Sequence, residues 1–219
     1  MSSLIQSSII KKVAMALSGL FLIIFLLQHF IINITSVFSE SIFNQFSHFM
    51  GKNFVVQFIA QPILIFGVIF HFVMGFYLEI QNTRATKYAY HKEMGSANSS
   101  WMSRNMIWSG LAILSFLVLH FIDFWIPEMN YKYVEFLPDD PNRYYEELVH
   151  KFEAPWRVSL YCVSFVLLSM HLLHGFSSAL KSMGANKYYS KFIKSFIHIY
   201  SIGIPLGFCF IALYHFLSH

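Results

Sequence analysis

Five apolar segments, each long enough to cross a membrane, limit what this chain can fold into. A spanning helix needs about 20 mainly apolar residues, and in lipid its backbone polar groups must be satisfied within the helix itself. We therefore predict an all-α integral membrane protein, a bundle of five transmembrane helices that forms one domain over residues 1–219 without a clear internal repeat. The expected helices cover approximately residues 13–35, 54–80, 104–126, 156–180 and 192–217.

The composition agrees with a membrane protein, because 56% of the residues are hydrophobic and 12% are charged. The formal net charge of +4 is compatible with nucleic-acid binding, but the basic residues are scattered at the ends of the apolar segments, as topology signals are. We therefore exclude nucleic acid and expect membrane lipid as the surroundings. The first segment begins like a secretory signal, yet no small-x-small cleavage pattern follows, so we expect it to be retained.

The Lys and Arg residues also predict an orientation, because cytoplasmic loops carry an excess of them. Twice as many lie on the N-terminal side of the expected bundle as on the other side. The N-terminus is therefore expected in the cytoplasm and the C-terminus outside. The first group is Lys11, Lys12, Arg84, Lys87, Lys92, Arg104, Lys181, Lys187, Lys191 and Lys194, and the second is Lys52, Lys132, Arg143, Lys151 and Arg157.

Prolines and polar residues are expected to kink, end or cap several of these helices. Pro62 is expected to kink the second helix and Pro127 to close the third. The pair Asp140-Pro141 is suited to cap a short surface helix through residues 145–152. The sequence 203–207, Gly-Ile-Pro-Leu-Gly, is expected to bend the fifth helix.

Four of the expected helices each carry a histidine, namely His29, His71, His120 and His174. A neutral imidazole in hydrocarbon is costly unless a metal or a hydrogen-bond partner satisfies its nitrogens. Four imidazoles on four helices are what two six-coordinate haem irons require. No C-x-x-C-H sequence occurs, so the haems would be held without covalent bonds, and Cys162 and Cys209 lie in apolar runs that disfavour a disulfide.

The expected depths of these histidines form two level pairs. At 1.5 Å per residue, His29 and His120 lie about 24 Å from the cytoplasmic ends of their helices, and His71 and His174 lie about 10 to 14 Å from the same face. An outer haem between His29 and His120 and an inner haem between His71 and His174 would follow. His171 lies one turn from His174 and competes with it as ligand, a choice that spacing alone leaves open.

The alternative interpretation is that these histidines hydrogen-bond between helices or fill an aromatic core. For one histidine we would favour it, but four at two matched depths favour haem ligation. His198 and His215, toward the ends of the fifth segment, are instead interpreted as hydrogen-bonded to backbone or lipid headgroups.

The pattern as a whole resembles a known family. The histidines of the first four helices and the sequence from His174-Gly175 to Gly184 are similar to those of the dihaem cytochrome b subunit of succinate:menaquinone oxidoreductases and fumarate reductases, of the five-helix, single-anchor b558 type. In that family the histidine before the glycine is the axial ligand, so the resemblance selects His174 over His171. One departure is Leu172, which stands where some fumarate reductases have a glutamate that serves a proton path.

The resemblance implies two haem b groups and two partners on the cytoplasmic face, a flavoprotein and an iron–sulfur protein. The chain would anchor them in the bacterial inner membrane and pass electrons between them and menaquinone. The dicarboxylate chemistry would belong to the flavoprotein, and this subunit would contribute the quinone site. The alternatives left open are a dihaem cytochrome b of another dehydrogenase, such as a hydrogenase or formate dehydrogenase, and a haem-free transporter or scaffold.

No motif marks the quinone site, so its expected residues follow from position alone. If electrons leave from the outer haem, the quinone must lie near the outer ends of the first and third helices and the start of the second. His48 and Asp123 rank first there, because both exchange protons. The other polar candidates are Asn44, Gln45, Gln57 and Gln61.

Overall fold

The computed structural model describes residues 8–87, 105–185 and 191–219, and these residues form helices and no strands. Five continuous helical stretches are long and apolar enough to cross a membrane, so the expected fold class is confirmed and the chain is a multi-pass membrane protein. The longest helix of each stretch is, in chain order, α2 (Ser8–Phe38), α4 (Gln61–Lys87), α7 (Met106–His120), α10 (Pro155–Ser182) and α11 (Lys191–Ser218).

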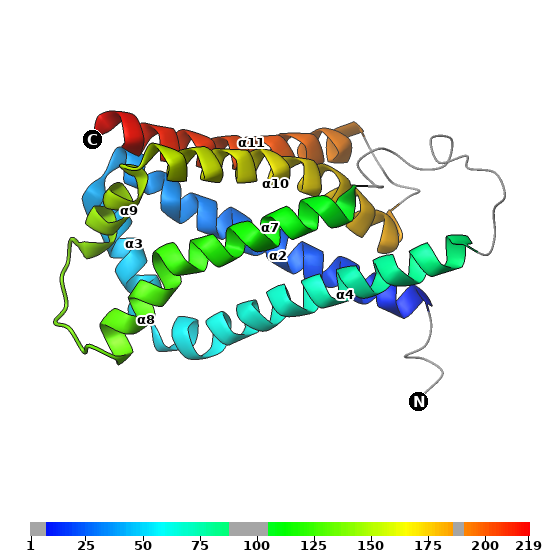
Figure 1. The fold of residues 1–219 in the computed structure, drawn as a ribbon, viewed down its shortest axis with the longest axis horizontal. Coiled ribbons are helices and arrows are strands. Elements are labelled where there is room, and N and C mark those ends of the chain that lie inside the picture. Colours follow the sequence, from blue (N-terminus) through cyan, green and yellow to red (C-terminus); the bar gives the residue numbers. More distant parts are fainter. Residues whose placement is uncertain (1–7, 88–104, 186–190) are drawn as a thin grey trace.

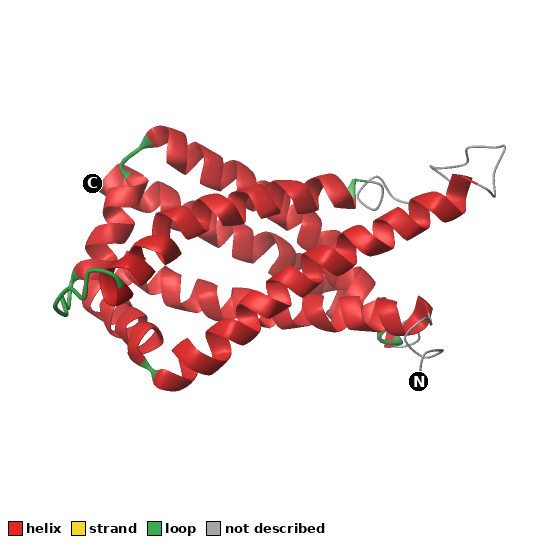
Figure 2. Ribbon diagram, turned by 60° about the horizontal axis from the view of Figure 1, so that its bottom comes forward, coloured by secondary structure: helices red, strands yellow, loops and turns green. Residues whose placement is uncertain are grey.

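The long helices lie along the long axis of the molecule and alternate in direction (Figures 1 and 2). The start of α2 and the ends of α4 and α10 lie at one end, which we call the N-terminal end. The C-terminus lies at the other, the C-terminal end, together with α3 (Glu40–Lys52), α8 (Ile126–Tyr133) and α9 (Arg143–Phe152).

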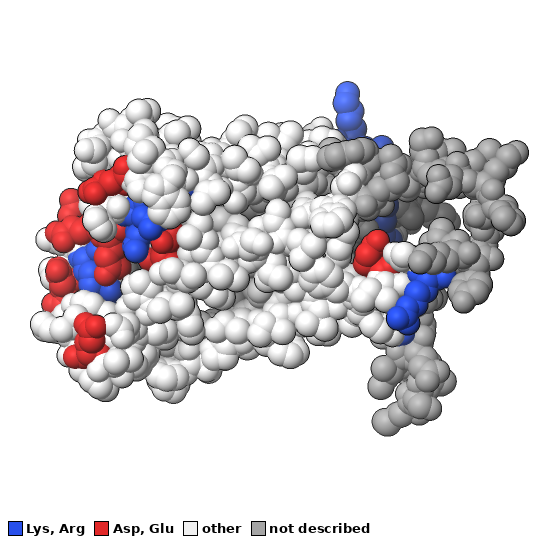
Figure 3. All heavy atoms as spheres, in the orientation of Figure 1, with Lys and Arg blue, Asp and Glu red and all other residues white. Residues whose placement is uncertain are grey.

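Charged side chains gather at the two ends and leave the middle of the bundle uncharged (Figure 3). Among the described residues, Glu79 is the one carboxylate near the N-terminal end, where Lys and Arg otherwise prevail. Lys92, Arg104 and Lys187 lie outside the described residues, as does the side chain of Lys87. The remaining described carboxylates lie at or near the C-terminal end, and they are Glu40, Asp123, Glu128, Glu135, Asp139, Asp140, Glu146, Glu147 and Glu153.

The best-packed part of the bundle is the contact of α10 and α11 with α2. Phe165 of α10 stacks on Phe208 of α11 with ring centres 5.3 Å apart, and Ala212 of α11 is completely buried. In contrast, α7 has no buried residue, and no described residue of α4 belongs to the buried core. The histidine-bearing side of the bundle is therefore less tightly filled than the side that α11 covers.

One of the prolines acts differently from the expectation. Pro127 does not close the third helix, because it lies in the first turn of α8 and the helical stretch continues to Tyr133. A π-helical segment, Phe121–Trp125, joins α7 to α8. Pro62 likewise lies at the start of α4, directly after the π-helical segment Val56–Ala60, which belongs to the second spanning stretch. Pro205 lies fully buried inside α11.

The polar connections are more structured than the sequence predicts. The stretch between the first two spans forms an unexpected helix, α3, whose start is capped by the Ser39 side chain. The expected surface helix is present as α9, but its cap was assigned wrongly. Asp140 accepts a bond from the Asn142 N–H within the preceding turn, while the start of α9 is capped from α3, where the Asn44 Oδ1 accepts from the Tyr145 N–H at 2.9 Å.

Candidate cofactor sites between paired histidines

One pair of imidazoles, the inner pair, joins α4 to α10. The rings of His71 and His171 have centres 6.4 Å apart and planes inclined by 68°. Each ring also contacts a serine of a neighbouring helix: the Nδ1 atom of His71 lies 3.1 Å from the Ser18 Oγ in α2, and that of His171 lies 3.1 Å from the Ser109 Oγ in α7. Four helices therefore meet at this pair.

The structure brings His171, not His174, to His71. Among the ring contacts of the described residues, none joins His174 to His71. The physical reason is helical geometry: successive residues are rotated by about 100°, so a side chain three positions further along points about 60° away. The His-Gly sequence that favoured His174 therefore does not determine which histidine faces the partner helix.

A second pair, the outer pair, joins α2 to α7. The rings of His29 and His120 have centres 5.8 Å apart and stand nearly perpendicular, at 87°. Each ring stacks on a phenylalanine one turn earlier in its own helix, Phe25 and Phe116 respectively. The buried Nδ1 atom of His120 has no hydrogen-bond partner in the structure. This pairing is the one that the depths of the two residues predict.

Both pairs fit one metal atom held between two imidazoles. A metal–imidazole bond is about 2 Å long, so rings on opposite sides of one metal have centres about 6 Å apart. The observed separations of 5.8 and 6.4 Å match this value. Imidazole is a ligand that haem iron commonly takes from proteins. All four rings are only partly buried by the surrounding side chains, so protein atoms do not enclose them completely.

Asp123 lies beside the outer pair, in the π-helical segment that directly follows His120. Its carboxylate is 3% exposed and accepts a hydrogen bond of 2.9 Å from the Tyr161 hydroxyl. Two cations face it, with the Arg157 Nε at 3.3 Å and the Lys151 Nζ at 4.0 Å. The Tyr161 ring also contacts the His120 ring, so Tyr161 connects the outer pair to Asp123 and to the partly exposed cations that face it at the C-terminal end.

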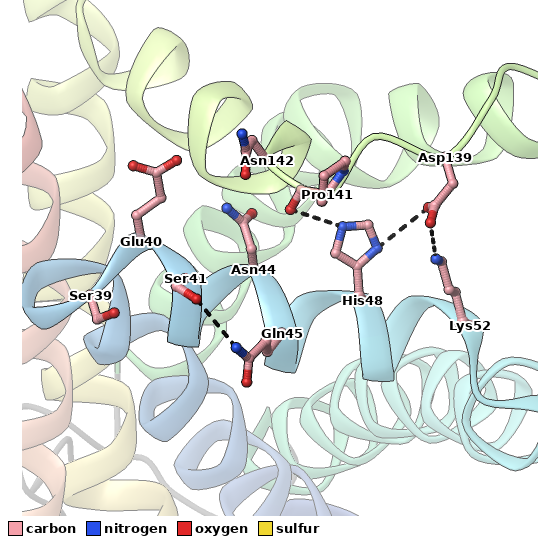
Figure 4. A pocket seen from close by; sticks show the side chains of 10 residues that line it. All are labelled: Ser39, Glu40, Ser41, Asn44, Gln45, His48, Lys52, Asp139, Pro141 and Asn142. Carbon is pink, nitrogen blue, oxygen red and sulfur yellow. Dashed lines mark hydrogen bonds and ion pairs between the residues drawn. The ribbon is translucent and has the colours of Figure 1, made fainter.

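Three of the other quinone candidates, Asn44, Gln45 and His48, line a pocket of about 730 Å³ between α3 and the turn before α9 (Figure 4). His48 contacts the Pro141 carbonyl and Asp139 there. A hydrogen bond from Lys52 lowers the pKa of the exposed Asp139 carboxyl. All the residues that line the pocket except Pro141 are polar or charged, whereas small-molecule sites are usually lined mainly by apolar and aromatic side chains. Gln57 bonds to the Gly51 carbonyl, and Gln61 at the start of α4 does not line this pocket.

The contacts reveal an internal repeat, contrary to the expectation of none. Residues 15–29 (MALSGLFLIIFLLQH) and 106–120 (MIWSGLAILSFLVLH) place Met, Ser, Gly, Phe and His at the same positions. Residues 71–76 (HFVMGF) and 171–176 (HLLHGF) correspond in the same way. Each histidine pair thus joins equivalent residues of the two halves. This repeat is the sequence signal that identifies His171 as the counterpart of His71.

A further histidine was interpreted wrongly. His215 of α11 is 1% exposed, and its Nε2 atom lies 2.9 Å from the Ser36 Oγ in α2. It therefore contacts a side chain of another helix and not lipid headgroups or its own backbone. His198, in contrast, contacts the Lys194 carbonyl as expected.

No family model, curated protein or solved structure matches this chain.

Proposed function

We propose that this chain is the dihaem cytochrome b subunit that anchors a succinate:menaquinone oxidoreductase or fumarate reductase in the bacterial inner membrane. The observation that carries the proposal is the presence of two imidazole pairs, each between equivalent helices of the two halves. His29 and His120 would hold the outer haem. His71 and His171 would hold the inner haem, so His171 replaces His174 as the fourth ligand.

When bound, each haem supplies reversible transfer of one electron. The chain contributes the imidazole nitrogens that hold it, apolar helices that exclude water, and two sites placed at different depths. Two sites at different depths on the same bundle suit electron transfer across the membrane.

The two ends of the bundle suit different tasks. The flavoprotein and the iron–sulfur protein would dock at the N-terminal end, which the positive-inside rule assigns to the cytoplasm. Menaquinone would react near the C-terminal end, where Asp123 and Tyr161 hold an exchangeable proton next to His120. The contact of His120 with Tyr161, the hydrogen-bond partner of Asp123, favours Asp123 over His48 as the residue that serves the quinone.

Haem content tests the ligand assignment. We expect a pyridine haemochrome assay of the purified protein to give two b haems per chain. His29→Ala or His120→Ala should remove one haem and leave the spectrum of the other intact, whereas His71→Ala or His171→Ala should remove the second. His174→Ala is the matched control and should retain both. A wild-type chain without haem would refute the proposal, and haem loss in the His174 variant but not the His171 variant would reverse the ligand choice.

Co-purification tests the assignment to this oxidoreductase. A tagged chain isolated in mild detergent should bring down a flavoprotein and an iron–sulfur protein that oxidise succinate or reduce fumarate. If the chain instead co-purifies with a hydrogenase or formate dehydrogenase, the assignment of two haems would stand but the proposed complex would be rejected.

A further inference from the structure

The inner histidines are each held by the same small element, repeated in α2 and α7. This element is Met-x-x-Ser-Gly, at residues 15–19 and 106–110. Ser18 donates its hydroxyl proton to the Met15 carbonyl at 2.8 Å, and Ser109 donates to the Met106 carbonyl at 2.9 Å. The same two oxygens lie 3.1 Å from the Nδ1 atoms of His71 and His171.

This double contact favours one protonation form of each imidazole. A serine hydroxyl has one proton to donate and two lone pairs to accept with. With each hydroxyl proton directed at a backbone carbonyl, the serine oxygen accepts from the histidine, which favours the tautomer that is protonated at Nδ1. Nε2 of both rings then keeps its lone pair, the form in which a neutral imidazole binds a metal.

Glycines beside the serines lie at matching places against the two rings. A Cβ atom on Gly19 would lie 3.4 Å from the His71 Cε1, and one on Gly110 would lie 3.9 Å from the His171 Cε1. On the facing helices, a Cβ on Gly75 would meet the Met15 side chain at 3.5 Å, and one on Gly175 would meet the Met106 side chain at 3.3 Å. The two halves thus build the same close-fitting seat for one imidazole each.

In the part of the chain that the structure describes, the histidines of the outer pair have no serine–glycine element of this kind against their rings. The Nδ1 atom of His120 is buried without a hydrogen-bond partner. The Asn33 amide nitrogen donates to the His29 carbonyl at 2.8 Å and also lies 3.4 Å from the His29 Nδ1, where an amide N–H faces that nitrogen as a donor and not as an acceptor. The protonation of the outer imidazoles is therefore not fixed in the same way, although they occupy equivalent positions of the repeat.

We propose that Ser18 and Ser109 are positioning residues that hold His71 and His171 as Nδ1–H tautomers, so that both Nε2 atoms are available to one iron and donate to it more strongly. This inference rests on the proposed function. A hydrogen bond accepted from Nδ1–H makes the imidazole a better donor, and such outer partners change metal affinity by about 10–100-fold. Stronger donation favours oxidised iron, so the serines lower the midpoint potential of the inner haem.

Redox titration of the purified protein tests this role. Ser18→Ala and Ser109→Ala should each raise the midpoint potential of the inner haem while the outer haem titrates as before. A tenfold weaker preference for oxidised iron corresponds to about 59 mV for one electron. Ser18→Thr and Ser109→Thr keep the hydroxyl and should restore the wild-type potential. Ser115→Ala is the matched control, because Ser115 of α7 bonds its own helix carbonyl at 3.0 Å and has no hydrogen bond to a histidine among the described residues.

A second experiment does not depend on haem, so its failure can be distinguished from a failure of the proposed function. In protein labelled with ¹⁵N-histidine, nitrogen chemical shifts of His71 and His171 should show the Nδ1–H tautomer, and the alanine variants should lose it. Nε2–H tautomers in the wild type would overturn the inference even if two haems are bound. Unshifted potentials in both alanine variants, or equal loss of inner haem in the alanine and threonine variants, would also overturn it.

Discussion

At the scale of single residues, Asp123 shows how a local irregularity of the helix positions a charge. The π-helical segment Phe121–Trp125 begins directly after His120, and Asp123 within it points at Tyr161 and Arg157. Single π-helical turns inside α-helices occur frequently at functional sites, because they rotate the following side chains relative to a regular helix. The wide turn therefore brings a buried carboxylate next to the outer histidine pair.

Asp123→Asn should raise the midpoint potential of the outer haem. The substitution removes a negative charge and leaves the Arg157 guanidinium without its counter-charge, and a less negative surrounding favours the reduced iron. A unit charge at this depth is expected to change the potential by some tens of millivolts. Quinone-linked turnover should slow, while succinate oxidation with an artificial acceptor at the partner subunits continues.

The matched control is Asp139→Asn, which removes an exposed carboxylate from the same end of the bundle. Equal potential shifts in the two variants would contradict a specific role of Asp123.

At the scale of elements, one arginine links α9 to α8 at the C-terminal end. Arg143 is 7% exposed, forms ion pairs with Glu128 of α8 and Glu147 of α9, and stacks on the rings of Tyr131 and Tyr144. Burial, together with the nearby Glu128 carboxylate, raises the pKa of Tyr144 above its usual range. Tyr144 therefore stays neutral and donates its proton to Glu128 at 2.8 Å.

Arg143→Ala should destabilise the packing of α9 by about 3 kcal/mol, because it leaves the Glu128 carboxylate paired only with Lys132 in a mostly buried position. Thermal unfolding in detergent and limited proteolysis of the segment before α9 would measure the loss. Glu146→Ala, an exposed position on the same helix, is the control and should leave both unchanged. Equal proteolysis of wild type and the Arg143 variant would show that the ion pairs do not hold α9.

At the scale of the whole molecule, the two halves carry their histidines at matching positions, and α11 covers only one side of the bundle. Repeat-related helices run in the same direction, so each pair of equivalent histidines meets at one depth (Figure 1). The repeat itself does not indicate which end of the bundle faces the cytoplasm. The uneven distribution of charge between the two ends does indicate it.

Reporter fusions test the expected orientation. Alkaline phosphatase fused after His219 should be active and a fluorescent protein fused there should be dark, since the C-terminus is expected outside. The same reporters fused after Thr83, near the end of α4, should give the opposite pattern. Reversed activities at both positions would place the N-terminus outside and move the expected docking face to the other side of the membrane.

The sequence by itself determined the five spans, because length and apolarity decide whether a segment can remain in lipid. It also determined the pairing of His29 with His120, because both lie at the same distance along helices that run in the same direction. The choice between His171 and His174 required the tertiary structure, since it depends on how α10 is rotated against α4. The structure likewise decided the cap of α9 by Asn44 and the burial of His215, because both arise from contacts between segments far apart in the chain.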